Sequence, residues 1–256
     1  MTRMGCKEMA GRHRLALLGG VFSAEDLRKR FSWSRETSRV TLHRWHHRDG
    51  LIRPLGGRSE VYFNLLVEPN WHAHFETAVK RAIPQTITIG QSAYSNGWIN
   101  QPPNARHLAV PSSAQLYGIE GCQFHVRRPD WFQAVAAGHV QTRRLTIPEL
   151  RPGWALADSL FAKAAYRNGD LRTPRTTDGQ AGAHSWVPDP DELYADDCTT
   201  EDVRDFTDAV EHLKAYYGFP TLLVNAFQLN MRLAYAAAHS FILGAVYGEH
   251  SPAPGL

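Results

Sequence analysis

"SRETSRVTLHRWHHRDGLIRP", residues 34–54, places five arginines and three histidines among 21 positions. Ser34 is a favoured helix-capping residue and Gly50 is a stop signal, so the stretch predicts a helix from Ser34 to about Arg48. At about 100° per residue, one narrow side of this helix is free of full charges and is predicted to face the core. Its members are Ser38, Thr41, Leu42 and Trp45. The remaining circumference is dominated by cations and is predicted to face outward.

The segments on either side of this helix complete a small domain. Residues 7–18 predict a first helix, and Ser23 with Asp26 three positions later predicts the capped start of a second. Beyond Gly50, apolar residues alternate on both sides of Gly56-Gly57, a pattern typical of a β-hairpin. Three helices followed by a basic hairpin are the element order of a winged helix-turn-helix, which we expect over residues 1–66.

A winged helix-turn-helix predicts specific contacts to double-stranded DNA. The third helix of such a domain lies in the major groove, with its N-terminal half toward the base edges. Arg35 and Arg39 are candidates for bidentate contacts to guanine, Thr37 for a base or a phosphate, and Val40 for a thymine methyl group. The cations farther along the helix and on the hairpin suit phosphates. The predicted DNA-binding residues are Arg35, Thr37, Arg39, Val40, His43, Arg44, Arg48, Arg53 and Arg58. For the helix taken alone, a solvated basic face is the alternative.

Charge and composition indicate two functional parts. Residues 1–60 hold 13 lysines and arginines against 6 acidic residues, whereas the remaining 196 residues hold 15 against 19. This asymmetry favours a basic module that meets a polyanion and a mildly acidic body. The cysteines Cys6, Cys122 and Cys198 form no CxxC pair, which favours reduced thiols and a cytoplasmic location. The apolar stretch 233–247 is shorter than the roughly 20 residues of a membrane span, so it predicts a packed terminal helix.

From residue 82 the sequence carries distinctive motifs: Ile89-Gly90-x-Ser92-Ala93, Gly97-Trp98, Ala109-Val110-Pro111, Arg128-x-x-Trp131-Phe132, a helix from Pro152 to Leu160, and "WVPDPDEL" at 186–193. With these motifs, residues 10–215 resemble the AbiEi family of antitoxins from type IV toxin–antitoxin systems. The resemblance implies an N-terminal winged helix that represses its own operon, with an operator of inverted repeats. It also implies a region that counters a nucleotidyltransferase toxin. We therefore expect an α+β protein with a mixed α/β antitoxin domain at 67–218 and an apolar helix and tail at 219–256.

The same order of strand, Gly-Ser turn, helix and strand occurs in nucleotidyltransferases, so the second domain is expected to be a degenerate version of that fold. In those enzymes the following strand carries carboxylates that hold Mg²⁺. Here that strand reads Arg106-His107-Leu108-Ala109-Val110, without an acidic residue. We therefore expect binding rather than catalysis, with no cofactor. Two alternatives stay open: a stand-alone winged-helix transcription factor and a nucleotidyltransferase-fold enzyme.

Two further clusters have a structural and a functional interpretation. His72, His74 and Glu76 could ligate a metal on a strand but would diverge on a helix, so we expect a surface role and no metal. Acidic residues are frequent between Asp189 and Glu211. They fit a capped helix start, because acids in a first turn complement the helix dipole, and they also fit a surface for a basic partner.

Overall fold

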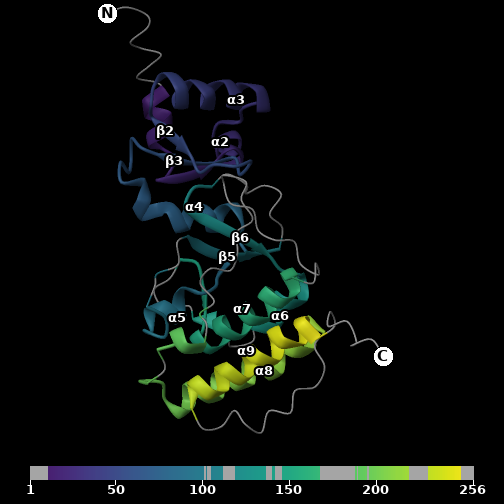
Figure 1. Cartoon of the computed structure of the whole chain (residues 1–256). Helices are drawn as coiled ribbons and strands as arrows, with labels where there is room; N and C mark the ends of the chain where they lie inside the picture. Colours follow the sequence, from purple (N-terminus) through teal and green to yellow (C-terminus); the bar gives the residue numbers. More distant parts are fainter. Residues whose placement is uncertain are drawn as a thin grey trace, which may run out of the picture. The chain divides into compact units, whose positions relative to one another are not determined.

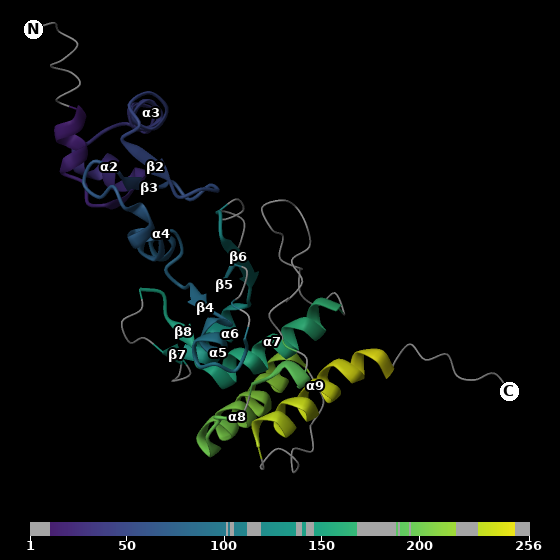
Figure 2. The ribbon, with the colours of Figure 1, turned by 60° about the vertical axis from the view of Figure 1, so that its left-hand side comes forward.

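The computed structural model describes residues 11–100, 102, 105–111, 119–136, 140–141, 146–167, 188, 190–194, 196–218 and 230–248. The chain is a mixed α+β protein with two β-sheets, and it divides into two compact units. The first unit comprises residues 1–86 with 114–120, and the second comprises residues 87–113 with 121–256. The ribbon of each unit is drawn in Figures 1 and 2.

The first unit combines helices with a three-stranded antiparallel sheet. After a helical segment at 11–16, its elements are β1 (Val21–Ser23), α2 (Ala24–Phe31), α3 (Arg35–His43), the π-helical turn η1 (Arg44–Arg48), β2 (Ile52–Pro54), β3 (Val61–Asn64), the 3-10 turn η2 (Trp71–His74) and α4 (Phe75–Ala82). The strands lie in the order β1-β3-β2. Val21 pairs with Phe63, and Ile52 pairs with Asn64. The predicted second and third helices and the hairpin are confirmed. The predicted first helix at 7–18 is confirmed at 11–16, while its residues 7–10 lie outside the described residues. Strand β1 was not predicted.

Local capping explains where α2 and α3 begin. The Ser23 hydroxyl accepts a hydrogen bond from the Asp26 backbone N–H, and the Asp26 carboxylate accepts one from the Ser23 N–H. The Ser34 hydroxyl accepts from the Thr37 N–H at 3.0 Å. Each bond satisfies a backbone donor that the first helical turn leaves without a partner. Both predicted caps are therefore confirmed.

The core of the first unit confirms the predicted inner side of the third helix. Ser38, Thr41, Leu42 and Trp45 are all buried, and Trp45 is only 1% exposed. Leu42 and Trp45 pack in one apolar cluster with Leu15, Leu27 and Ile52. The buried Asn64 side-chain amide donates to the carbonyls of Leu15 at 2.8 Å and Leu18 at 3.0 Å, and this ties β3 to the end of the first helix.

The second unit is built on a five-stranded mixed sheet in the order β6-β5-β4-β8-β7. β5 runs parallel to β6 and β4 parallel to β8, whereas the other two pairs are antiparallel. Its elements are β4 (Ile87–Thr88), α5 (Gln91–Ser95), β5 (Arg106–Val110), β6 (Cys122–Val126), α6 (Pro129–Ala136), β7 (Val140–Gln141), β8 (Glu149–Leu150), α7 (Pro152–Arg167), the 3-10 turn η3 (Pro190–Glu192), α8 (Thr200–Tyr217) and α9 (Met231–Gly248). The predicted order of strand, turn, helix and strand at 87–110 is confirmed.

Helix α7 is the centre of the second core. It packs against α5, α8 and α9, which Figures 1 and 2 show side by side with it. Gly153 permits the close approach of α8, because a Cβ there would lie 2.7 Å from the Phe206 backbone nitrogen. On α9, Ala234, Tyr235 and Ile242 are buried in the same core, so the apolar stretch 233–247 forms a packed helix as predicted. Over the described residues, no helix has the length and apolar character needed to cross a membrane.

The boundary between the two units lies after residue 86, farther along the chain than the boundary at residue 66 that the sequence indicated. The sequence assigned residues 67 onward to the second domain, but η2 and α4 belong to the first unit, where α4 contacts β1 and β3. Likewise, α9 belongs to the second unit rather than to a separate terminal region. Local composition does not mark either boundary, because each one depends on which distant element the helix packs against.

Candidate nucleic-acid interface

The outer circumference of α3 and η1 is accessible to a partner. All nine residues predicted from the sequence to contact DNA are exposed: Arg35, Thr37, Arg39, Val40, His43, Arg44, Arg48, Arg53 and Arg58. Val40, at 58%, is the most exposed large apolar side chain among the described residues. Because the four inward residues hold the helix against the core, the exposed side chains are presented on a fixed support.

Several of the exposed cations are paired with neighbouring carboxylates. Arg39 Nη2 lies 3.0 Å from Glu36 Oε1, with both side chains largely exposed. Arg44 Nε and Arg48 Nε each lie 3.7 Å from an oxygen of Asp49. Surface pairs of this kind contribute about 0–1 kcal/mol, so a phosphate could exchange with the carboxylate at little cost.

A hollow of about 320 Å³ lies beside α3 and is lined from α2, α3, η1 and the hairpin. We call it the basic groove. Three arginines and three histidines line it: Arg28, Arg35, Arg39, His43, His46 and His47. Pro54, Glu60 and Tyr62 complete its wall on the hairpin side. Sequence reasoning missed Arg28, because its position at the groove depends on how α2 packs against α3.

The histidines of the groove form a contiguous cluster. The His47 ring centroid lies 4.2 Å from that of His46 and 4.5 Å from that of His43. His46 Nδ1 lies 3.2 Å from the Ile52 carbonyl oxygen, within hydrogen-bond distance. Desolvation, and then the neighbouring histidines, lower the pKa of His47 below its ordinary value. His47 is therefore protonated less readily than an ordinary histidine, whereas the three arginines of the groove carry a permanent positive charge.

The β2–β3 hairpin carries the two remaining predicted contacts, in different settings. Arg58 follows Gly56 and Gly57, which adopt φ angles of 116° and 59° that favour glycine. The Arg53 guanidinium carbon lies 4.1 Å from the centroid of the Trp71 ring. Its Nη2 also lies 3.9 Å from Glu120 Oε2. Arg53 is therefore held by an aromatic face, whereas Arg58 sits beside the hairpin turn.

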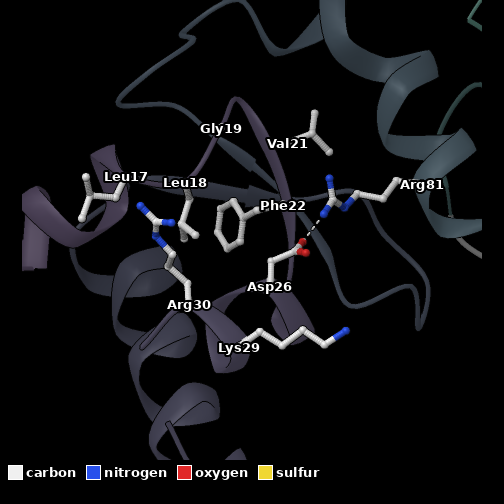
Figure 3. Close-up of a pocket in the computed structure, with 9 residues that line it drawn as sticks. All are labelled: Leu17, Leu18, Gly19, Val21, Phe22, Asp26, Lys29, Arg30 and Arg81. Carbon is white, nitrogen blue, oxygen red and sulfur yellow. Dashed lines mark hydrogen bonds and ion pairs between the residues drawn. The ribbon is translucent and has the colours of Figure 1, made fainter. Parts of the chain in front are cut away.

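A second, shallower hollow of about 530 Å³ lies on another part of the first unit (Figure 3). Leu18 and Phe22 form its apolar base. On its rim Arg81 forms an ion pair with Asp26, the same carboxylate that caps α2, as the dashed line in Figure 3 marks. Lys29 lies 2.6 Å from Glu25. The Arg81–Asp26 pair joins α4 to α2, and both pairings offset positive charge at the rim. This hollow is therefore a weaker candidate for an anionic ligand than the basic groove.

The histidines near α4 do not converge on a metal position. His72 stacks on Trp71 at a centroid distance of 3.6 Å, and His74 Nε2 lies 3.5 Å from Glu68 Oε2. They lie on a 3-10 turn, where side chains two apart diverge. In the described part of the chain, no group of three or more His, Cys, Asp or Glu side chains is arranged to hold a metal ion.

Much of the acidic segment has structural partners. Thr199 and Asp202 form a capping box at the start of α8. The Asp205 carboxylate lies 2.7 Å from Arg151 Nη2, just before α7. Asp196, which is 90% exposed, lies 3.7 Å from Arg232. Asp189 lies outside the described residues. The helix-start interpretation is thus supported for Asp202, while Asp208 stays exposed on α8.

The second unit buries several polar side chains, among them His107, His125, Arg127 and Asp158. Gly90, with φ of 88°, begins α5. His107 Nδ1 and His125 Nε2 lie 2.9 Å apart on β5 and β6, and burial lowers the pKa of His107 to about 4. Asp158 on α7 pairs with Arg127, both fully buried. No family model, curated protein or solved structure matches the chain.

Proposed function

We propose that residues 11–66 form a winged helix-turn-helix that binds double-stranded DNA, with α3 in the major groove and the β2–β3 hairpin on adjacent phosphates. The observation that carries this proposal is the division of one helix into two sides. Ser38, Thr41, Leu42 and Trp45 are buried, while all the predicted contact residues around them are exposed. A capped, anchored helix with a cationic outer side matches the shape and charge of a major groove.

The electrostatics of the first unit support the same assignment. The basic groove brings Arg28 from α2 together with Arg35 and Arg39 from α3. The hairpin adds Arg53 on β2 and Arg58 beside the turn, both of which are exposed. Phosphate contacts from several elements fix the orientation of a protein on a duplex, and base contacts from one helix then supply sequence preference.

We further propose that the protein is a cytoplasmic transcriptional repressor and the antitoxin of a type IV toxin–antitoxin system. It would autoregulate its operon through an operator of inverted repeats, and its second unit would counter a nucleotidyltransferase toxin. The motif resemblance to AbiEi antitoxins supports this role. We also propose that the second unit is a degenerate version of the nucleotidyltransferase fold. Its support is the turn at Gly90 followed by β5, which lacks carboxylates.

The DNA-binding proposal is tested with purified full-length protein and randomised duplexes, followed by anisotropy titrations at several salt concentrations. Arg39→Ala should weaken binding to the selected site by about 1–3 kcal/mol and relax the preference at one position. Arg58→Ala should weaken all duplexes alike and reduce the salt slope by about 1. Arg53→Ala should do the same and also lose its packing on Trp71.

Arg204→Ala is the matched control, because Arg204 is exposed on α8 in the second unit. It should leave affinity and salt slope unchanged. Unchanged affinity of the Arg39, Arg53 and Arg58 variants would contradict the winged-helix proposal.

The antitoxin proposal is tested separately, by co-expression with the neighbouring reading frame. If that frame encodes a nucleotidyltransferase whose toxicity disappears on co-expression, the antitoxin role is supported. Its absence would favour a stand-alone transcription factor. Transfer of labelled nucleotide by the purified chain with Mg²⁺ would instead favour the enzyme alternative.

A further inference from the structure

The outermost side of α3 is not formed by its arginines. At about 100° per residue, Glu36, Val40 and His43 point within about 30° of the direction opposite the buried stripe of Ser38, Thr41, Leu42 and Trp45. We call these three residues the outer ridge. They are spaced four and three residues apart, so they are neighbours on the helix surface. In Figure 2, where α3 is seen nearly along its axis, it lies at the edge of its unit.

The cations lie to the sides of this ridge. Arg35 and Arg39 are turned about 70–110° from its centre, toward the basic groove that they line. Arg44 is turned about 70° in the opposite sense. A helix that enters a groove with its anchored side outward places its outer ridge toward the base edges and its flanks toward the two phosphate backbones.

Glu36 is the chemically unexpected member of the ridge. It is the single carboxylate in the sequence between Arg35 and Arg48, and its side chain is 69% exposed. A carboxylate on a surface that meets phosphates repels them, so it weakens sequence-independent binding. Among the base edges in the major groove, cytosine and adenine each offer an exocyclic amino donor to a carboxylate. Adenine presents the N7 acceptor beside that amino group, which repels a carboxylate, so cytosine is the better match.

The contact with Arg39 prepares Glu36 for such a role. The Arg39 guanidinium donates to Glu36 Oε1 at 3.0 Å, which restrains the carboxylate. An ionised carboxylate has about four acceptor sites, so Oε1 and Oε2 together can accept further hydrogen bonds. Val40, which is 58% exposed one turn farther on, offers an apolar contact suited to a thymine methyl group.

We infer that Glu36 is a specificity-determining residue that reads cytosine of a C·G base pair, with Val40 beside it on the neighbouring base. This inference rests on the proposed DNA binding. Glu36 contributes discrimination rather than affinity: it accepts from the cytosine amino group and disfavours the acceptor-bearing edges of guanine and thymine. Arg39 acts as its positioning partner.

The first turn of a helix favours an acid for structural reasons alone, and the chain contains a matched control for that effect. Glu25 also lies in a first turn, on α2, and its carboxylate lies 2.6 Å from Lys29 with 61% of the side chain exposed. Glu25 therefore has the same dipole and pairing interactions as Glu36. It differs in lying outside the outer ridge of α3.

The experiment selects binding sites from randomised duplexes with full-length wild-type protein and the Glu36→Ala, Glu36→Gln and Glu25→Ala variants. Affinities are then measured for the selected site, its single-base variants and an unrelated duplex. Wild type should require cytosine at one position. Glu36→Ala should lose that preference, with discrimination there falling about ten- to hundredfold, and should bind the unrelated duplex more tightly. Glu36→Gln should also lose the cytosine preference, and Glu25→Ala should keep the wild-type pattern.

The outcomes separate this inference from the function on which it rests. If wild type selects a sequence and both Glu36 variants keep the same preference at every position, the inference is overturned while DNA binding stands. An equal loss of discrimination in Glu25→Ala also overturns it, because the effect then does not depend on a carboxylate in the outer ridge. If wild type binds no duplex, both proposals fail. Because discrimination is a ratio measured on the folded fraction of each variant, partial unfolding does not alter it.

Discussion

Replacing Asp158 by alanine is the sharpest test of how the second unit is held together. The Asp158 carboxylate accepts three hydrogen bonds inside the protein. They come from Arg127 Nη2 at 2.9 Å, Trp131 Nε1 at 2.8 Å and Tyr217 Oη at 2.6 Å. The Asp158 and Arg127 side chains are fully buried. Burial raises the pKa of Tyr217 well above its ordinary value, so its hydroxyl keeps the proton that it donates.

The expected cost follows from what the substitution leaves behind. Asp158→Ala leaves the buried Arg127 guanidinium without this carboxylate, and breaking a buried ion pair in this way costs about 3–5 kcal/mol. The Trp131 and Tyr217 donors lose the same acceptor, at about 1 kcal/mol or more each where water does not replace it. We therefore expect the free energy of unfolding of the second unit to fall by at least about 3 kcal/mol. That is a large part of the total stability of an ordinary domain.

Urea unfolding followed by tryptophan fluorescence and circular dichroism measures this loss, and hydrogen exchange in α7 and α8 assigns it to the second unit. Asp208→Ala, an exposed acid on α8, is the control and should change stability by less than about 0.5 kcal/mol. The double variant Arg127→Met with Asp158→Ala should cost less than the sum of the single variants, because the two side chains act as a pair. A loss below about 1 kcal/mol in Asp158→Ala, or strict additivity in the double variant, would refute the reasoning.

Two further predictions concern the same unit. Burial lowers the pKa of His107 to about 4 in the folded protein, so the unfolded chain binds the proton more readily below about pH 6.5. Stability from the neutral His107 ring is complete above that pH and is lost as pH falls toward 4. Between pH 7 and 5, the free energy of unfolding of His107→Gln should fall by up to about 2 kcal/mol less than that of wild type, as measured by denaturant titrations at each pH. The same pH dependence in both proteins would contradict this. Gly153→Ala should lower the free energy of unfolding by about 1–3 kcal/mol, because the new Cβ would lie 2.7 Å from the Phe206 nitrogen. The denaturant midpoint should fall accordingly; an unchanged midpoint would show that α8 can move away.

The features that could be predicted from the sequence depend on residues a few positions apart. A cap needs Ser34 and the backbone of Thr37, and the inner side of α3 needs only the helical period. The hairpin is indicated by alternation around Gly56-Gly57, and the basic character of the first unit by counting charges. The exposure of all nine predicted contact residues follows from the same short-range pattern, because the few apolar positions leave one way to pack the helix.

Other features depend on residues that are distant in the chain. Asp158 meets Arg127 across 31 positions and Tyr217 across 59, and no periodicity connects them. Strand β1 has three residues, and its pairing with β3 defines it as a strand. The placement of Arg28 at the basic groove, the stacking of Arg53 on Trp71 and the division of the chain after residue 86 likewise depend on packing.

The sequence alone therefore determined which helix carries the charge and which of its sides is held by the core, because capping and helical period act within one or two turns. Only the tertiary structure decided which residues of other elements lie next to that helix. Arg35 and Arg39 border a groove that α2 and the hairpin complete. The physical reason is that the neighbours of a helix are set by the elements against which it packs. For α3 those elements come from segments up to about 30 residues away in the chain.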